Sequence, residues 1–134
     1  MRRVTGPILT LVAAVVLASL GAAEEKKDDK KETGKAHVVL MKDNKFEVKD
    51  SKDKDKTKLV VTVGDTVVWE NAGDNPHTAT SVKDADKDLA FDTGEVESGK
   101  KSKAVEFKKA GTVKYFCKVH GMTMSGTIEV KEKK

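Results

Sequence analysis

Short runs in which apolar and polar residues alternate cover most of the chain after residue 36. β-Branched residues crowd the segments 37–41, 59–63 and 66–71, and Gly64-Asp65 supplies a turn signal between the last two. No stretch has the period of a helix of any length. The pattern therefore predicts an all-β sandwich or barrel of about seven to eight short strands.

The C-terminal part of the chain continues the same pattern. KAVEF (103–107) and TVKYFC (112–117) alternate on either side of KKAG, which predicts a hairpin, and TIEV (127–130) forms the last strand. NAGDNP (71–76) is rich in turn residues and predicts a loop, after which a strand resumes at His77. The large apolar residues of these strands are the expected core: Val67, Trp69, Phe107, Val113 and Tyr115.

The first 35 residues have a different composition from the rest. Arg2 and Arg3 precede an apolar run over 8–20, and small residues at 21–23 lead to an abrupt change of polarity at Glu24. This order is typical of a secretory signal peptide over 1–23, and an uncleaved anchor is the alternative. Residues 24–35 contain almost only charged and polar side chains and predict a disordered leader, so the folded domain is expected over 36–134.

Export and charge balance narrow the functional classes. We expect a periplasmic or extracellular monomer with no stable membrane insertion after cleavage. Loss of Arg2 and Arg3 leaves 24 basic and 22 acidic side chains, with the two signs interleaved and aromatics scarce. Nucleic-acid binding would require a one-signed stripe with stacking residues, so it is not expected. The charged tract 50–58 is interpreted as a solvated loop or hairpin tip rather than a docking surface.

The chain contains a single cysteine, Cys117. Exported proteins meet an oxidising compartment in which cysteines usually pair, but one cysteine cannot form an internal disulfide. Such a thiol is buried, paired between chains, reactive or bound to a metal.

Soft-metal donors gather around this cysteine. His120 follows Cys117 in a C-x-x-H spacing, Met122 and Met124 come next, and His77 lies 40 residues earlier at the opening of another strand. A Greek-key sandwich brings such loops together at one end. Two imidazoles and a thiolate, with a weak axial thioether, make a blue-copper site, whereas structural zinc sites do not usually use methionine.

Each donor taken alone also has an ordinary structural interpretation. A free cysteine is commonly a small buried hydrophobe, a histidine caps a loop, and a methionine fills a gap in the core. The combination in one exported β-domain favours the metal site. His37 has no such neighbours and is interpreted as an ordinary strand residue.

Three segments carry a resemblance to a known family: VGDTVVWENAGDNPHTA (63–79), FDTG (91–94) and GTVKYFCKVHGMTMSGTIEV (111–130). In order and spacing they resemble the plastocyanin and pseudoazurin branch of the cupredoxins, over 36–130. The resemblance implies a Greek-key β-sandwich with one copper ion cycling between Cu(I) and Cu(II).

The resemblance also implies the roles of individual residues. His77, Cys117 and His120 are the expected copper ligands, and Met124 is the expected axial ligand because MSG matches the family's Met two residues before a Gly. The interval from His120 to Met124 is one residue shorter than in plastocyanin, which keeps Met122 as the competitor. Asn71 and the backbone amide of Thr78 are the expected outer supports of the site.

The function implied is electron transfer by a small non-enzymatic protein that docks transiently on redox protein partners. A periplasmic copper-storage or delivery protein is the first alternative, and the surplus Met122 suits it. A metal-free binding module is the second alternative, but it would leave Cys117 without a role. No Ser–His pair lies in a nucleophile motif, so hydrolysis is not expected.

Overall fold

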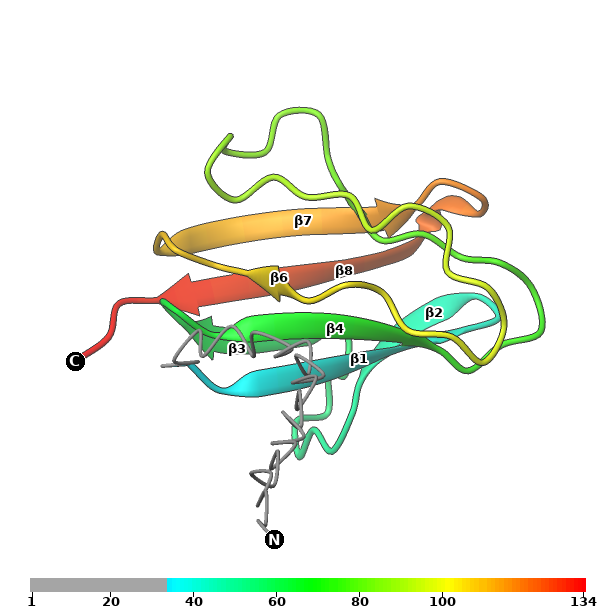
Figure 1. Cartoon of the computed structure of the whole chain (residues 1–134), viewed down its shortest axis with the longest axis horizontal. Coiled ribbons are helices and arrows are strands. Elements are labelled where there is room, and N and C mark those ends of the chain that lie inside the picture. The colour runs from blue at the N-terminus through cyan, green and yellow to red at the C-terminus, as the bar shows by residue number, and fades with distance from the viewer. Residues whose placement is uncertain (1–33) are drawn as a thin grey trace, which may run out of the picture.

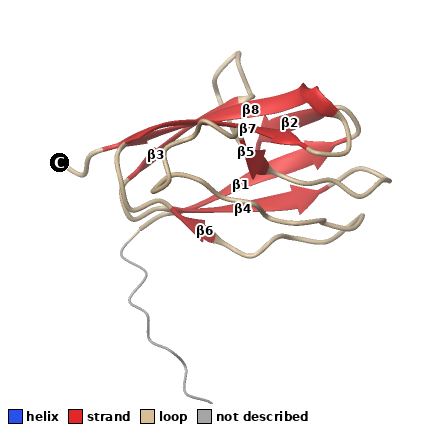
Figure 2. Cartoon of the chain, turned by 90° about the horizontal axis from the view of Figure 1, so that it is seen from above, coloured by secondary structure: helices blue, strands red, loops and turns tan. Residues whose placement is uncertain are grey.

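The computed structural model describes residues 34–134, which form two stacked β-sheets without a helix (Figures 1 and 2). One sheet has the strand order β2-β1-β4-β6 and the other β3-β8-β7-β5. The strands are β1 (Ala36–Lys42), β2 (Lys45–Val48), β3 (Lys58–Thr62), β4 (Thr66–Asn71), β5 (Thr80–Ser81), β6 (Val105–Glu106), β7 (Gly111–Cys117) and β8 (Gly121–Lys131). The predicted all-β sandwich is confirmed.

Both sheets are mixed. β1 runs parallel to β4 and β3 parallel to β8, while the remaining pairs are antiparallel. The Gly64-Asp65 turn leads from β3 in one sheet to β4 in the other. Asp65 holds this crossing because its carboxylate accepts hydrogen bonds from the backbone N–H groups of Lys35 and Thr62, at 2.7 and 2.9 Å, and contacts His37 Nε2 at 2.9 Å.

The hairpin predicted around KKAG is wrong. β6 pairs with β4 in the first sheet, whereas β7 pairs with β8 and β5 in the second, so the connection crosses between the layers. The alternating apolar residues Phe107, Val113 and Tyr115 of these segments are buried in the core. Alternation does not specify which strands pair. Here the two strands belong to different sheets, and both sheets bury apolar residues in the shared core.

The core lies between the two sheets. Val67 and Trp69 point inward from β4, and Val113 and Tyr115 from β7, so period-two alternation places them against each other. Trp69 and Tyr115 meet edge to face with ring centroids 5.6 Å apart. All five expected core residues are buried, including Phe107.

Residues 50–57 of the charged tract 50–58 form a mostly exposed loop between β2 and β3, as the loop interpretation predicted, and Lys58 opens β3. Within residues 34–134 no helix is long and apolar enough to span a membrane. The expected signal peptide and the leader up to residue 33 lie outside the described residues.

One end of the sandwich collects the segments that carry the expected ligands. β1 and β4 end side by side, with Met41 in register with Asn71, and β7 ends at Cys117 (the right-hand end in Figure 1). The β1–β2 turn, the loop 72–77 and the β7–β8 turn therefore meet at this edge.

Candidate metal centre

The expected Cys and His ligands lie at the end of a strand or in the segment that follows one, and Met124 lies within β8. Cys117 is the last residue of β7, and His120 lies in the short turn before β8. His77 follows the loop after β4 and is fixed by backbone hydrogen bonds with Val96 in both directions, at 3.2 and 2.8 Å. The sheets thus bring together residues 40 positions apart in the sequence.

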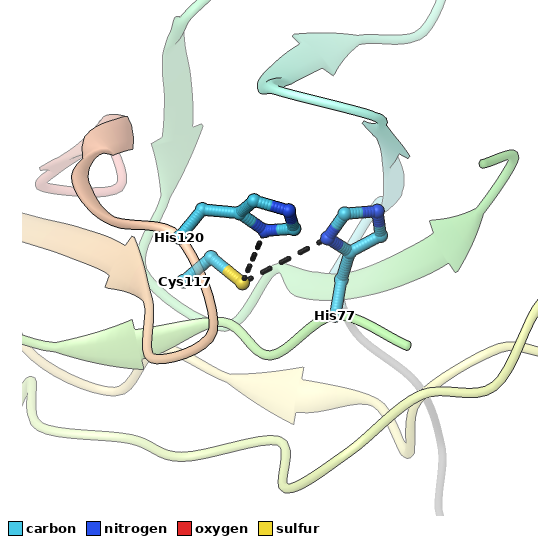
Figure 3. Close-up of side chains that lie close together, drawn as sticks. All are labelled: His77, Cys117 and His120. Carbon is cyan, nitrogen blue, oxygen red and sulfur yellow. Dashed lines mark hydrogen bonds between the residues drawn. The ribbon is translucent and has the colours of Figure 1, made fainter. Parts of the chain in front are cut away.

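The three side chains converge on one point (Figure 3). Cys117 Sγ lies 3.8 Å from His77 Nδ1 and 3.6 Å from His120 Nδ1, and the two imidazole centroids are 4.9 Å apart. One donor atom from each residue lies within 4.8 Å of the other two. His77 and Cys117 are completely buried, while His120 is partly exposed.

This geometry fits a metal ion in a trigonal plane. A first-row ion lies about 2.0–2.1 Å from an imidazole nitrogen and about 2.3 Å from a thiolate, which puts sulfur and nitrogen about 3.7–3.8 Å apart at 120°. Both observed Sγ–Nδ1 distances are close to this value. The donor set, one thiolate with two imidazoles, suits copper in either oxidation state.

The surroundings keep His77 in the form that binds metals. Burial, and then the neighbouring His120, lower the pKa of His77, while Asp43 acts in the opposite direction. A neutral imidazole offers a free nitrogen lone pair, so a lowered pKa favours ligand binding over protonation at neutral pH.

Both expected outer supports are confirmed. The backbone N–H of Thr78 donates to Cys117 Sγ at 3.4 Å, which stabilises negative charge on the sulfur. The buried Asn71 side chain donates to the carbonyls of Asn75 and Val96 at 2.7 and 2.8 Å and accepts from the N–H of Gly73 at 2.9 Å. Asn71 therefore fixes the loop that delivers His77.

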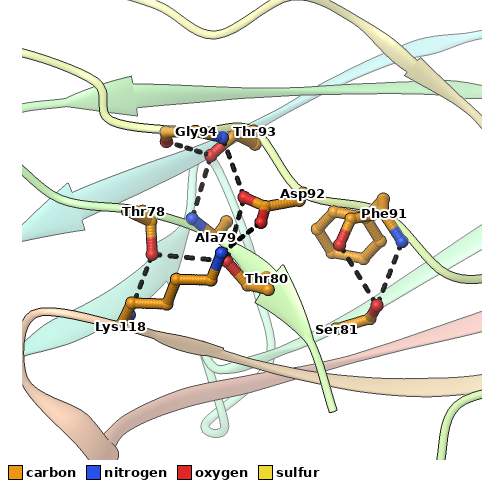
Figure 4. A network of polar contacts seen from close by, with 9 residues as sticks. All are labelled: Thr78, Ala79, Thr80, Ser81, Phe91, Asp92, Thr93, Gly94 and Lys118. Carbon is orange, nitrogen blue, oxygen red and sulfur yellow. Dashed lines mark hydrogen bonds and ion pairs between the residues drawn. The ribbon is translucent and has the colours of Figure 1, made fainter. Parts of the chain in front are cut away.

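A polar network joins the two segments that carry His77 and Cys117 (Figure 4). Thr78 Oγ1 accepts the backbone N–H of Lys118 at 2.8 Å, and Thr80 Oγ1 donates to Asp92 Oδ1 at 3.1 Å. Lys118 closes the network by an ion pair with Asp92. These contacts hold the strand after His77 against the residue after Cys117.

The roles of Thr80, Asp92 and Lys118 were missed by the sequence analysis. A signal was present in FDTG, since Asp followed two residues later by Gly is a turn pattern. In the structure, Asp92 Oδ1 accepts the N–H of Gly94 at 2.9 Å, and Gly94 has a positive φ of 67°.

Burial separates the two methionines. Met124 is completely buried, whereas 59% of Met122 is exposed. Ser125 pairs with Phe116, after which the β7–β8 register shifts and Cys117 pairs with Gly121. Met124 therefore lies next to the end of β7 and faces the core like Cys117, and this placement favours Met124 over Met122 as the axial donor.

A family model of copper-binding proteins, the plastocyanin/azurin family, matches residues 43–131. The chain belongs to this family. The expected relation to the cupredoxins is thereby confirmed, and with it copper as the metal of the site. No curated protein sequence matches the chain.

Solved structures of copper proteins are also similar to the chain. An oxidised variant of amicyanin is 26% identical, with a TM-score of 0.57 over 70% of this chain and 80% of amicyanin. A reduced amicyanin variant is 27% identical, with a TM-score of 0.59 over 72% and 82%. A copper-containing nitrite reductase from Thermus scotoductus SA-01 is 25% identical, with a TM-score of 0.60 over 72% of this chain and 22% of the reductase.

Proposed function

We propose that this cupredoxin carries single electrons between redox proteins, with copper held by His77, Cys117, His120 and, on the axis, Met124. The observation that supports this most is the preassembled cluster of two imidazoles and a thiol, all aimed at one point on a rigid sandwich. Copper bound there supplies a reversible Cu(I)/Cu(II) couple.

The residues around the cluster suit electron exchange because they resist rearrangement. His77 lies between β4 and β5 and Cys117 ends β7, and the Thr78–Lys118 contact and the Asn71 bonds hold the two segments. A donor set that both oxidation states accept, and that cannot move far, keeps the cost of reorganisation small. Complete burial of His77 and Cys117 also excludes water from the thiolate.

We further propose that partners dock at the end of the sandwich where His120 lies. His120 is the one histidine of the cluster that reaches the surface, and Val119 and Met122 beside it are 55% and 59% exposed. An apolar surface around a partly exposed ligand suits the small, transient interfaces of redox proteins. A charge placed there, as in Met122→Lys, is expected to slow exchange with an apolar partner while leaving the absorption spectrum unchanged.

We propose that the protein is not an enzyme. Burial of His77 and Cys117 leaves their donor atoms out of reach of a substrate, and Met124 is completely buried as well. The similarity to the nitrite reductase covers about a fifth of that chain and is compatible with a shared copper-binding domain.

We propose that the chain is exported, that residues 1–23 are removed as a signal peptide, and that 24–35 form a leader before the domain at 36–134. The apolar run and the charge change at Glu24 support this. Mass spectrometry of the mature protein in its native host tests the cleavage, and an intact N-terminus in the membrane fraction contradicts it.

Copper storage or delivery is the second candidate, because the thioether of Met122 lies at the surface and offers a soft donor for Cu(I).

The visible spectrum and a His77→Ala variant test the ligand set. We expect intense absorption from the sulfur–Cu(II) bond, its loss or alteration in His77→Ala, and recovery with added imidazole. An unchanged spectrum in His77→Ala overturns the assignment.

A further inference from the structure

The far side of the His77 ring presents an unused donor. Nδ1 faces Cys117, while Nε2 is buried and has no hydrogen-bond partner among the described residues. An unpaired buried polar atom costs free energy, so an uncompensated Nε2–H at this position requires an explanation. Metal-binding histidines usually give their other N–H to a carboxylate, a carbonyl or a water.

Gly73 leaves a gap beside this nitrogen. A Cβ atom at Gly73 would lie 3.1 Å from His77 Nε2 and 2.9 Å from Asp43 Oδ1. The imidazole nitrogen and the carboxylate oxygen therefore flank the same small volume, which any side chain at position 73 would fill.

The gap is held open by the loop itself. Gly73 donates its N–H to Asn71 Oδ1 at 2.9 Å, and its carbonyl accepts the hydroxyl of Ser98 at 2.7 Å. Asp43 is held on the other side, because it follows β1, whose Met41 carbonyl accepts the N–H of Ala72 at 2.8 Å. These backbone contacts fix the loop at Gly73 and the turn that carries Asp43, while the Asp43 side chain itself is exposed.

We propose that Asp43 is a positioning residue for His77, an inference that rests on the proposed ligand role of this histidine. The Asp43 carboxylate accepts the Nε2–H of His77, directly after a small side-chain shift or through one water in the Gly73 gap. This contact keeps the proton on Nε2, leaves Nδ1 bare toward Cys117, and makes the imidazole a stronger donor to Cu(II). Gly73 is required because a larger residue would separate the pair.

Two matched variants test the contact. Asp43→Ala removes the acceptor and one negative charge, while Asp74→Ala removes the same charge from an exposed residue next to Gly73. In the metal-free protein, ¹⁵N NMR of the histidine rings is expected to show His77 protonated on Nε2 in the wild type and in Asp74→Ala. Asp43→Ala is expected to show a mixture of the two tautomers and about tenfold faster solvent exchange of the Nε2 proton.

The reduction potential supplies the second measurement. Loss of an outer partner typically weakens metal binding by about 10–100-fold. If Cu(II) is weakened tenfold more than Cu(I), the potential of Asp43→Ala rises by about 59 mV relative to Asp74→Ala. Gly73→Ala is expected to shift the tautomer and the potential in the same direction.

Equal tautomer populations and equal potentials in Asp43→Ala and Asp74→Ala would overturn the proposal, whatever the outcome for Gly73→Ala. The NMR measurement needs no copper, so it distinguishes this failure from a failure of the proposed function. A wild-type protein that has the expected tautomer but no reversible couple would refute electron transfer and leave the Asp43–His77 contact standing.

Discussion

Replacing each of the two neighbouring methionines by leucine separates the axial ligand from a surface residue. Met124 is completely buried, and leucine has nearly its volume, so Met124→Leu is expected to cost less than about 1.5 kcal/mol of folding stability. Met122 is 59% exposed, and Met122→Leu is expected to change stability by no more than about 0.5 kcal/mol. Both variants should therefore fold and bind copper.

Their reduction potentials should differ. The thioether sulfur of methionine donates electron density to Cu(II), whereas leucine has no donor atom. Removal of the thioether therefore destabilises the oxidised state and raises the reduction potential. If the contact favours Cu(II) by about 1.5–3 kcal/mol, comparable to a hydrogen bond with a charged group, the rise is about 60–130 mV. We expect this shift in Met124→Leu, with an altered visible spectrum, and a potential unchanged within experimental error in Met122→Leu.

Voltammetry of the two copper-loaded variants beside the wild type, with denaturant unfolding as the stability control, makes the comparison. A shift in Met122→Leu without one in Met124→Leu would show that the axial assignment is wrong and that the loop adopts another register in solution.

Three further predictions concern the sulfur, the core and the surface charges. Cys117→Ser should abolish the intense visible absorption while far-UV circular dichroism stays that of a β-protein, and a coloured variant would contradict the thiolate assignment. Gly126→Ala should destabilise the fold by about 1–3 kcal/mol in denaturant titrations, because its Cβ would lie 2.5 Å from Cζ and Oη of the buried Tyr115; a smaller loss would mean that the core gives way there. A hydrogen bond from Lys42 is the main cause that lowers the pKa of Glu47 from its ordinary value near 4.5 to about 2. The ionised Glu47 carboxylate therefore stabilises the fold fully above pH 4.5, and this stabilisation is lost as the pH falls toward 2. Glu47→Gln should flatten the decline of the unfolding free energy in this window, and an unchanged slope would contradict the ion pair.

Much of the site could be predicted from the sequence because it depends on local signals. The strand ending at Cys117, the turn residues before His77 and the C-x-x-H spacing are all short-range features. The structure brings the three expected donors together, and it buries Met124 while exposing Met122, which the sequence left open.

Pairing between distant segments could not be predicted in the same way. The alternation of KAVEF and TVKYFC specifies a buried face for each strand, but it does not say that β6 joins β4 while β7 joins β8. The positions of Asp43 and Asp92 beside the ligand segments likewise depend on turns that are 34 and 25 residues from His77 and Cys117. Such contacts follow from the three-dimensional arrangement and leave no periodic pattern.

The central claim, reversible single-electron transfer at a Cys-bound copper, is tested most directly by cyclic voltammetry of the copper-loaded protein with its visible spectrum recorded in both states. We predict a reversible one-electron couple whose oxidised form absorbs intensely and whose reduced form is colourless. Copper that remains Cu(I) across the potential range, or that leaves the protein on oxidation, would contradict the account and favour copper storage or delivery.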